Sequence, residues 1–439
     1  MERSILRKLE DWKNKNNFKP LILQGARQVG KTWVMKEFGR RCFDNFLYVS
    51  FNDSIEAKIL FEQTYNTENL LLGLETLCKG KITKGKTLII LDEIQECERA
   101  LGSLKFFNEN IKGLHVMAAG SLLGVAVRKR NMSFPVGQVE FLNLKPMSFI
   151  EFLWANGENQ LADVLKNRNY GLVNAFAEKL TSLFKQYLFV GGMPEAVAEF
   201  VSKHDFDNVQ KIQTQILTGY RNDFSKYIES FNITKVEQIF DSIPYQLSKE
   251  NKKFSYKLVK STARAREYES ALEWLCLCGL VKKVCRVSVP KLPLKAYEDN
   301  SVFKLFFIDC GLLCRMSGLD SLSLMQGNRI FEEFKGALAE QFIFQTLSLH
   351  DEISLFYWTN DNSTMEIDFL MQKKNLIIPI EVKSSTNVKS RSFFNFCEKY
   401  SCDVKVRTSL MPSEIRDGLY NIPLYMMEYI DEILNADLF

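Results

Sequence analysis

Short apolar runs alternate with stretches of helical periodicity over the first 145 residues. The apolar runs predict five strands, at residues 20–24, 45–51, 87–91, 114–118 and 139–142. Four of the five runs are rich in Leu, Ile, Val or aromatic residues and show little alternation, which is typical of strands buried on both faces of a parallel sheet. The alternation of strands with helices predicts an α/β domain over residues 1–145.

Helical periodicity dominates residues 146–230. Apolar residues recur at three- and four-residue spacing from Phe149 onward and again between Phe176 and Leu188, as they do in amphipathic helices. The sequence Gly191-Gly192-Met193-Pro194 interrupts this pattern, so we expect one helix to end there and the next to begin. The region is predicted to be a helical, lid-like domain.

Residues 231–300 have the pattern of a small module. An amphipathic helix comes first, a basic stretch follows at residues 249–257, and two further helices come next, the second at residues 267–278. A β segment at residues 280–289 closes the module. Three helices that end in a hairpin predict a winged-helix-like domain.

Residues 301–439 mix strands with helices and predict a second α/β domain. Strands are expected at residues 303–308, 354–358, 367–371 and 376–382. No repeats or low-complexity segments occur, so the four predicted domains are expected to be joined by short linkers.

Composition excludes two broad classes of protein. Of the 439 residues, 46% are hydrophobic and 25% are charged, which rules out a wholly disordered chain. The 57 Lys and Arg nearly balance the 53 Asp and Glu, for a net charge of +4. A histone-like blanket of positive charge is therefore excluded, although a local basic groove is not.

The cellular compartment can be predicted from the apolar runs and the cysteines. No apolar run of signal-peptide type begins the chain, and no run is long enough to span a membrane. The closest pairs among the ten cysteines, Cys276 with Cys278 and Cys310 with Cys314, lack partners at zinc-site spacing. We therefore expect a cytoplasmic protein with reduced cysteines, most of them packed as small apolar side chains.

An eight-residue P-loop pattern follows the first predicted strand and precedes a predicted helix. In such a loop, backbone N–H groups and a helix N-terminus surround the phosphates of a nucleoside triphosphate. The lysine reaches the β- and γ-phosphates, and the hydroxyl that follows it binds Mg²⁺. The predicted ATP-binding residues are Gly25, Ala26, Arg27, Gln28, Val29, Gly30, Lys31 and Thr32.

The third predicted strand ends in the acidic pair Asp92-Glu93, at the edge where ligands of open α/β sheets bind. Asp92 is predicted to bind Mg²⁺ together with Thr32, and Glu93 to polarise the attacking water. The fourth strand is followed by Ser121, which would either sense the γ-phosphate or simply form a turn. Lys31 and Glu93 are thus the predicted catalytic residues of this site.

ATPases that couple hydrolysis to motion usually place an arginine near the γ-phosphate. Arg128, Arg130 and Arg221 are the candidates in this sequence. Solvated surface charge is the alternative explanation for each of them.

A second group of carboxylates lies far along the chain. Glu381 and Lys383 are two residues apart on a predicted strand and so share a face, and a hairpin would bring Asp368 beside them. Carboxylates that hold Mg²⁺ beside a lysine suit metal-dependent phosphodiester cleavage. Glu340, on a helix predicted at residues 332–347, would add a third oxygen ligand. The alternative is a strand face that carries a salt bridge.

Seven basic side chains cluster in the predicted winged-helix region, where they would meet DNA phosphates or form a solvated helix face. They are Lys249, Lys252, Lys253, Lys257, Lys260, Arg264 and Arg266.

The order of motifs resembles prokaryotic AAA-type ATPases (archaeal-ATPase-like) that carry a C-terminal domain of unknown function. The match rests on the P-loop and on later motifs that run along nearly the whole chain: Leu-Asp-Glu-Ile-Gln at 91–95, Ala-Gly-Ser at 119–121, Pro-Met-Ser-Phe-Ile-Glu-Phe-Leu at 146–153, Gly-Gly-Met-Pro-Glu at 191–195, Phe-Lys-Gly-Ala at 334–337 with Glu340, and Glu-Val-Lys at 381–383.

This resemblance implies an AAA+/STAND-like ATPase core, a helical and winged-helix middle, and a C-terminal domain similar to PD-(D/E)xK nucleases. It matches Asp368, Glu381 and Lys383 to the nuclease motif and Glu340 to its helix acid. Relatives often carry Gly-Arg where this chain has Gly137-Gln138. If that arginine senses phosphate, another residue must supply the charge here.

Three functions are compatible with the sequence. The first is a Mg²⁺-dependent ATPase that drives a nuclease-like tail acting on DNA. The second is a regulatory switch that hydrolyses ATP slowly and uses its tail only for protein contacts. The third is an ATP-gated Mg²⁺ endonuclease. A protein partner or homo-oligomer is left open, and no membrane partner is expected.

Overall fold

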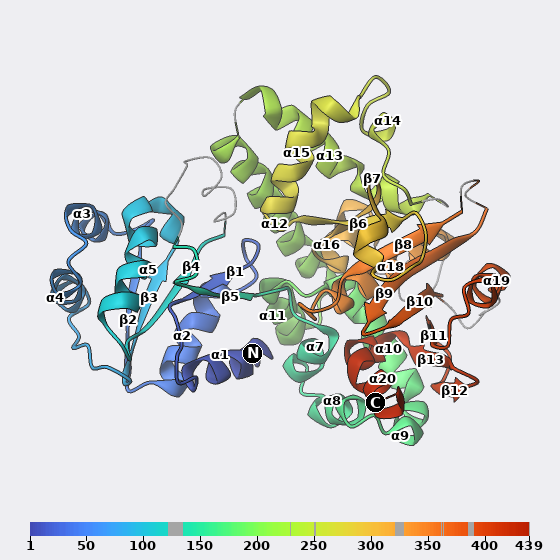
Figure 1. The fold of residues 1–439 in the computed structure, drawn as a ribbon, viewed down its shortest axis with the longest axis horizontal. Helices are drawn as coiled ribbons and strands as arrows, with labels where there is room; N and C mark the ends of the chain where they lie inside the picture. The colour runs from blue at the N-terminus through green and yellow to red at the C-terminus, as the bar shows by residue number, and fades with distance from the viewer. Residues whose placement is uncertain are drawn as a thin grey trace. The chain divides into compact units, whose positions relative to one another are not determined.

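The computed structural model describes residues 1–121, 135–228, 230–249, 252–320, 329–360, 362, 364–384 and 390–438. The chain divides into two compact units (Figure 1). Unit 1 comprises residues 1–145 with 277–279, and unit 2 comprises residues 146–276 with 280–439. The division after residue 145 lies at the first boundary expected from the sequence.

Unit 1 is built on a parallel five-stranded sheet. Its strand order is β2-β3-β4-β1-β5. The five strands predicted from the sequence are confirmed with small shifts at their ends. They are β1 (Leu21–Gln24), β2 (Asn45–Ser50), β3 (Thr87–Asp92), β4 (His115–Ala119) and β5 (Glu140–Asn143).

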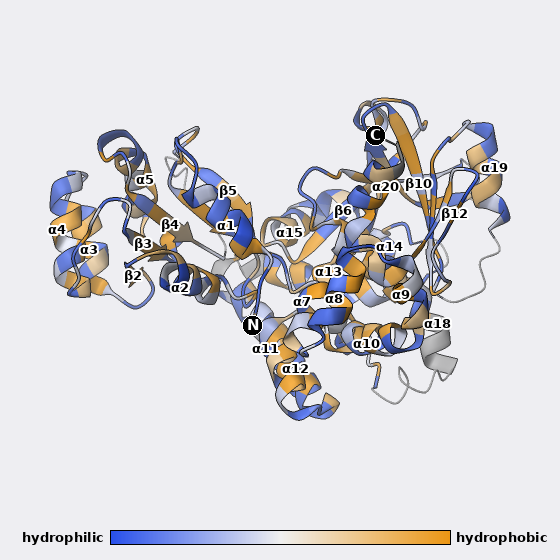
Figure 2. Ribbon diagram, turned by 90° about the horizontal axis from the view of Figure 1, so that it is seen from below, coloured by the Kyte–Doolittle hydropathy of each residue, from blue (hydrophilic) through white to orange (hydrophobic). Residues whose placement is uncertain are grey.

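Helices cover both faces of this sheet (Figure 2), and its central strands β3 and β4 are buried along their whole length. On one face, α3 (Ile55–Gln63), α4 (Thr67–Cys78) and α5 (Glu98–Asn110) bury their apolar side chains against β2, β3 and β4. On the other face lie α1 (Ile5–Lys13) and α2 (Lys31–Cys42), which meet where Trp12 contacts Phe38. The result is a three-layer α/β/α unit.

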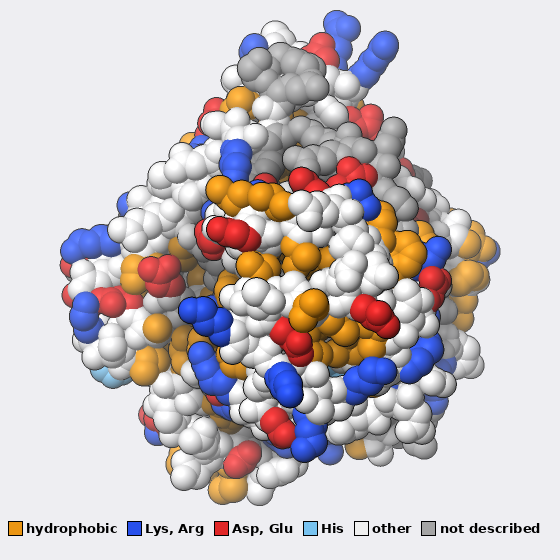
Figure 3. All heavy atoms as spheres, turned by 90° about the vertical axis from the view of Figure 1, so that its left-hand side faces the viewer, with side chains coloured by type: hydrophobic (Ala, Val, Ile, Leu, Met, Phe, Trp, Pro, Cys, Tyr) orange, Lys and Arg blue, Asp and Glu red, His pale blue; other side chains and the backbone are white. Residues whose placement is uncertain are grey.

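The outer surface of α3 and α4 carries apolar side chains between charged ones (Figure 3). Ile55, Ile59 and Leu72 are exposed there.

Unit 2 begins with helices that the sequence predicts. Gly191 and Gly192 separate two of them, and Pro194 opens the second. A Cβ at residue 192 would lie 2.1 Å from the Met147 carbonyl oxygen, so only glycine allows this crossing. The helices are α7 (Phe149–Ala155), α8 (Asn159–Lys166), α9 (Tyr170–Ala175), α10 (Ala177–Val190), α11 (Pro194–Lys203) and α12 (Phe206–Tyr227).

The next segment contains three helices and two antiparallel strands. Lys253 forms an isolated antiparallel bridge with Lys304, before the second of these helices. The elements in order are α13 (Ser230–Ser248), α14 (Tyr256–Val259), α15 (Ala265–Leu277), β6 (Val281–Val287) and β7 (Glu298–Phe307). The short helix η2 (Leu294–Tyr297) lies between the two strands.

These two strands also belong to the sheet of the C-terminal region. The eight-stranded sheet has the order β12-β13-β11-β10-β9-β8-β6-β7, and β6 pairs with β8 in parallel. The expected boundary between residues 300 and 301 therefore falls inside β7. Periodicity identifies a strand but not the sheet that it joins, so the sequence could not reveal this continuity.

The remaining strands of this sheet come in two runs of three consecutive strands, with one described helix between the runs. The strands are β8 (Leu355–Thr359), β9 (Glu366–Lys373), β10 (Leu376–Val382), β11 (Lys405–Ser409), β12 (Glu414–Arg416) and β13 (Leu419–Pro423). The helices are α16 (Cys310–Met316), α18 (Arg329–Leu347), α19 (Arg391–Lys399), η3 (Leu424–Tyr429) and α20 (Ile430–Leu438). Among the described helices, none has both the length and the apolar character needed to cross a membrane.

Candidate active site

The predicted P-loop connects the end of β1 to the start of α2. Ala26 and Val29 are buried, whereas Arg27 and Gln28 are exposed. Gln28 and Gly30 have positive φ angles of 66° and 94°, which close the loop tightly before the helix begins. The structure therefore places residues 25–30 between β1 and α2, and Lys31 and Thr32 in the first turn of the helix, an arrangement that suits phosphate binding.

Gly25 lets the loop approach the end of β5. Its φ is 151°, and a Cβ at this position would lie 2.3 Å from the Leu144 carbonyl oxygen. Any side chain at residue 25 would therefore push the loop away from the segment that follows β5.

The Lys31 side chain is buried inside the loop. Its Nζ donates hydrogen bonds to the carbonyl oxygens of Gly25 at 2.9 Å and Ala26 at 2.8 Å. Burial lowers the pKa of Lys31 to about 8, and the nearby carboxylates of Glu93 and Asp92 oppose this shift. The loop thus holds a desolvated ammonium group at the place where a phosphate would supply the missing negative charge.

Thr32 and Asp92 meet at the start of α2 and the end of β3. The Thr32 hydroxyl donates to Asp92 Oδ2 at 2.6 Å, and the Tyr48 hydroxyl donates to the same oxygen at 3.1 Å. Burial and the Asp92 carboxylate raise the pKa of Tyr48, so Tyr48 is a hydrogen-bond donor. Hydroxyl and carboxylate oxygens are the ligands that Mg²⁺ prefers, and this pair fits a Mg²⁺ ion beside the P-loop.

Glu93 follows directly in the left-handed conformation, with φ 50° and ψ 44°. Its carboxylate oxygen Oε2 accepts a hydrogen bond from Gln95 Nε2 at 2.6 Å and another from the Ser121 hydroxyl at 3.3 Å. The structure therefore brings Ser121 and Glu93 together, as neighbouring strand ends of a parallel sheet should.

One of the three arginine candidates, Arg221, lies among the described residues. Arg128 and Arg130 lie outside the described residues. Arg221, in unit 2, pairs with Asp241 at 2.5 Å. Gln138, at the position where relatives often have arginine, accepts a hydrogen bond from Asn108.

The carboxylates of unit 2 meet at a β-hairpin. Strands β9 and β10 are antiparallel, which confirms the expected hairpin. Asp368 Oδ2 accepts a hydrogen bond from the Val382 amide at 2.8 Å, and Glu381 pairs with Lys383 at 2.7 Å. Burial, Glu340 and Glu381 raise the pKa of Asp368 well above its usual value, so the three acids lie within electrostatic reach of one another.

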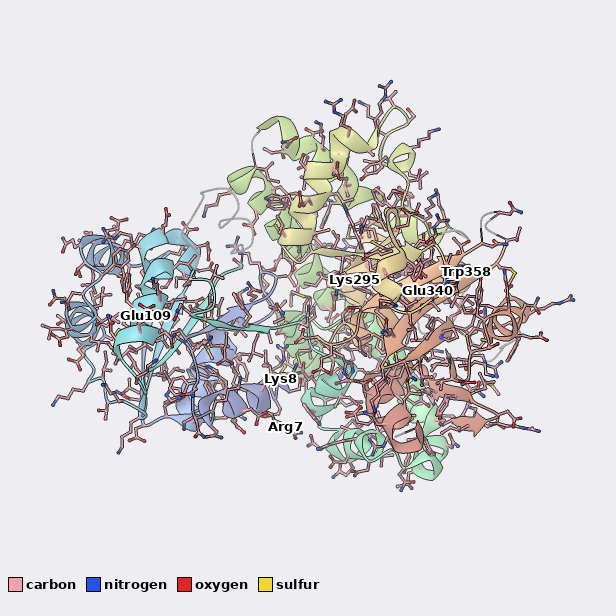
Figure 4. The ribbon with its side chains drawn as sticks, viewed as in Figure 1. Arg7, Lys8, Glu109, Lys295, Glu340 and Trp358 are labelled. Carbon is pink, nitrogen blue, oxygen red and sulfur yellow. The ribbon has the colours of Figure 1, made fainter. Side chains whose placement is uncertain are left out.

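Lysines already neutralise Glu340, which is labelled in Figure 4. Its carboxylate forms ion pairs with Lys252 and with Lys304, the latter at 3.3 Å. Lys304 also pairs with Glu366 and is fully buried. These two lysines lower the pKa of Glu340 to about 2 against the effect of burial.

This pairing does not fit the predicted metal site. Among the described residues, no group of three or more His, Cys, Asp or Glu side chains is arranged to hold a metal ion. Glu340, which was expected to ligate a metal with Asp368 and Glu381, pairs instead with Lys252 and Lys304. The sequence motifs did not predict a role for Lys304. This lysine is on β7, whereas its acidic partners are on α18 and β9.

The seven basic residues of the middle segment differ in exposure, and two of them, Lys249 and Lys252, are half-buried. Lys252 is used by Glu340 and is only partly exposed, so it cannot also meet an external phosphate. The exposed members are Lys253, Lys257, Lys260, Arg264 and Arg266.

Comparisons with known proteins agree with this description of unit 1. Residues 17–153 match the family model of an AAA domain. The parallel sheet with its P-loop is the fold of a P-loop nucleoside triphosphatase. The match supports an AAA-type ATPase. Residues 181–323 and 335–427 match models of two domains of unknown function, DUF8612 and DUF4143. No curated protein matches the chain.

Several solved structures resemble the chain at low identity. The Walker-type ATPase PABY2304 of Pyrococcus abyssi is 13% identical, with a TM-score of 0.44 over 71% of this chain and 94% of that one. The ORC2 protein of Aeropyrum pernix is 12% identical, with a TM-score of 0.37 over 74% and 95%. The RuvB Holliday junction branch migration motor of Thermotoga maritima is 15% identical, with a TM-score of 0.29 over 68% and 94%.

Sequence reasoning missed two residues that contact this site. The first is Tyr48. The only signal in the sequence was its position near the end of β2, the strand next to β3. Arg3 is the other. Its buried guanidinium donates to the carbonyl oxygens of Val29 in the P-loop, at 3.1 Å, and Lys145, at 2.6 Å. Nothing in the N-terminal sequence marks Arg3, because both of its acceptors are backbone atoms.

Proposed function

We propose that unit 1 binds and hydrolyses ATP in a Mg²⁺-dependent reaction. The observation that carries this proposal is the 2.6 Å contact between the Thr32 hydroxyl and Asp92 beside the buried ammonium of Lys31. A cation inside the loop and paired oxygen ligands at its exit are the two features that phosphoryl transfer requires.

Each residue has a role in this proposal. The backbone amides of residues 25–30 and the Lys31 ammonium bind the phosphates, while Thr32 and Asp92 hold Mg²⁺, which neutralises charge on the β- and γ-phosphates. Glu93 polarises the attacking water. Ser121 lies beside Glu93 and senses the γ-phosphate.

Two substitutions test this assignment. Lys31→Ala should abolish ATP binding, measured by calorimetry with Mg²⁺-ATP. Glu93→Gln should keep binding and reduce turnover by at least about a hundredfold, because a carboxamide cannot accept the proton of water. Lys105→Ala and Glu109→Gln change an exposed pair on α5 and serve as matched controls. Normal turnover by Glu93→Gln would contradict the role of Glu93.

We further propose that ATP hydrolysis is coupled to a winged-helix-like segment and a nuclease-like C-terminal region that act on DNA. The order α13, α14, α15, β6 and β7, with the Lys253–Lys304 bridge before α14, supports a winged-helix topology. The exposed Lys257, Lys260, Arg264 and Arg266 supply positive charge for DNA phosphates.

DNA-dependent ATP turnover tests this coupling. We expect DNA to stimulate turnover, and the double substitution Lys257→Glu/Arg264→Glu to remove the stimulation without changing the basal rate. Lys105→Glu reverses one exposed charge on unit 1 and controls for general charge effects. Indifference to DNA at low salt would contradict the proposal.

A second candidate is a slow regulatory switch whose C-terminal region makes only protein contacts. The observation that favours it is the ion pairing of Glu340 with Lys252 and Lys304, which leaves no role for a metal ion at that carboxylate. Under this alternative, plasmid DNA stays intact with Mg²⁺ or Mn²⁺. Nicking that is lost in Lys383→Ala would instead support a metal-dependent nuclease.

A further inference from the structure

We propose that Gln95 is a positioning residue for Glu93, holding its carboxylate in the orientation that receives the attacking water. This inference rests on the proposed role of Glu93 in ATP hydrolysis. It adds a residue to which neither the sequence motifs nor the family match gives a role.

The contact between the two side chains is short and partly buried. Gln95 Nε2 donates to Glu93 Oε2 at 2.6 Å, and Gln95 is 4% exposed. The Ser121 hydroxyl donates to the same oxygen from the end of β4. Since both donors meet Oε2, they fix the carboxylate and leave its other oxygen, Oε1, as the one directed to a water molecule.

The backbone favours this contact. Glu93 has a left-handed φ of 50°, which ends β3 and starts the one-turn helix η1 (Ile94–Glu96). A non-glycine residue keeps this conformation only where its surroundings enforce it, as they often do at functional sites. The turn brings a residue two positions along the chain, Gln95, back to the Glu93 carboxylate.

The other end of the Gln95 carboxamide argues against a purely structural role. Gln95 Oε1 is buried and has no hydrogen-bond partner among the described residues. An unpaired buried carbonyl oxygen lowers the stability of the fold. An apolar side chain of similar size would fill this space without that loss, so the donor nitrogen is the group that accounts for a glutamine here.

The decisive substitution is Gln95→Met, which keeps the length and volume of the side chain but removes both the donor and the unpaired acceptor. We expect kcat for ATP to fall about tenfold. The affinity for Mg²⁺-ATP should be unchanged, and the melting temperature should be equal to or higher than that of the wild type. Gln95→Glu, isosteric but without a donor, should lower kcat at least as much. Gln138→Met, which affects a glutamine bonded to Asn108, is the control.

A double-mutant cycle separates positioning from packing. In the Glu93→Gln background, adding Gln95→Met should change turnover no further, because the group that Gln95 positions has already lost its function. Unchanged kcat in Gln95→Met would overturn the inference while leaving the role of Glu93 intact. A parallel loss of melting temperature and ATP affinity would also overturn it, since that pattern marks a structural residue. Full turnover by Glu93→Gln alone would remove both proposals together.

Discussion

At the scale of single residues, burial in unit 1 strongly perturbs Lys31. It is 6% exposed, and among the described residues two backbone carbonyls accept hydrogen bonds from it. Burial lowers its pKa from 10.5 to about 8. The protein in the absence of nucleotide therefore keeps a charged group that its own fold disfavours.

This perturbation has a definite effect on stability. Below pH 8 Lys31 is charged in both the folded and the unfolded chain. The free-energy cost of burying its charge then has its full value, on the order of 3 kcal/mol. Between pH 8 and 10.5 the folded chain loses the proton first, and the penalty disappears. Lys31→Met should therefore melt at a higher temperature than the wild type at pH 7. The difference should shrink towards pH 10 in thermal melts without nucleotide.

Mg²⁺-ATP provides the control for this measurement. It should raise the melting temperature of the wild type and leave that of Lys31→Met unchanged. A variant that is less stable than the wild type at pH 7 would show that the two carbonyl contacts outweigh the burial of charge.

The local pattern of the sequence made the P-loop predictable, whereas the neighbours of its residues were not. Glycines, lysine and threonine at fixed spacing between a strand and a helix define the phosphate site within eight residues. Arg3 and Tyr48 contact the site through atoms that only the folded chain brings near. No spacing rule connects these two residues to the loop, so they had to be seen in the structure. Gln95 lies in the motif at residues 91–95, but its contact with Glu93 depends on the turn that follows β3.

At the scale of elements, the start of α7 depends on a residue from the far end of the chain. Ser148 and Glu151 form a reciprocal capping box. The Ser148 hydroxyl also donates to Glu428 Oε1 at 3.1 Å. Burial, together with the neighbouring Glu151, raises the pKa of Glu428 to about 8, so this carboxyl is protonated in the folded protein at neutral pH.

Glu428→Gln should change how stability depends on pH. In the wild type, the folded chain keeps the Glu428 proton between pH 4.5 and 8 while the unfolded chain releases it, so stability falls as pH rises through this window. A glutamine cannot titrate and is nearly isosteric. The melting temperatures of the variant and the wild type should therefore agree near pH 5. From there up to pH 8, the variant should become progressively more stable than the wild type. Glu398→Gln, at an exposed residue of α19, should match the wild type throughout.

The strands were predictable at this scale, but their partners were not. Apolar runs such as residues 87–91 and 376–382 correspond closely to β3 and β10. The pairing of β6 with β8 is set by tertiary contacts between segments distant in the sequence, so a boundary was expected inside β7.

At the scale of the whole molecule, the two units have separate cores and separate chemistry. Unit 1 holds the proposed nucleotide site. Unit 2 holds a buried group of charges in which Lys304 joins residues from α18 and β9. The sequence indicated both regions, yet it suggested a metal for the second because the same carboxylates suit either a metal ion or a lysine.

Thermal unfolding should show this separation. We expect two unfolding transitions in calorimetry, and Mg²⁺-ATP should raise the melting temperature of only one of them. Lys304→Met should lower the stability of the other unit alone, by roughly 3–5 kcal/mol, because it leaves the buried Glu340 and the half-buried Glu366 with less compensating charge. Lys295→Met, which changes a mostly exposed lysine of η2, is the control. A single transition that responds to both changes would mean that the units unfold together.

The parallel pairing of β6 with β8 also affects how the protein is made. During synthesis, β6 and β7 leave the ribosome well before β8, β9 and the acids that neutralise Lys304. Until those segments have been synthesised, the edge of β6 that pairs with β8 has no neighbouring strand. Lys304, in the apolar strand β7, then lacks its acidic partners. Such unpaired edges favour association between nascent chains. A chain that terminates early, before residue 355, would expose this edge permanently and become a substrate for chaperones and proteases.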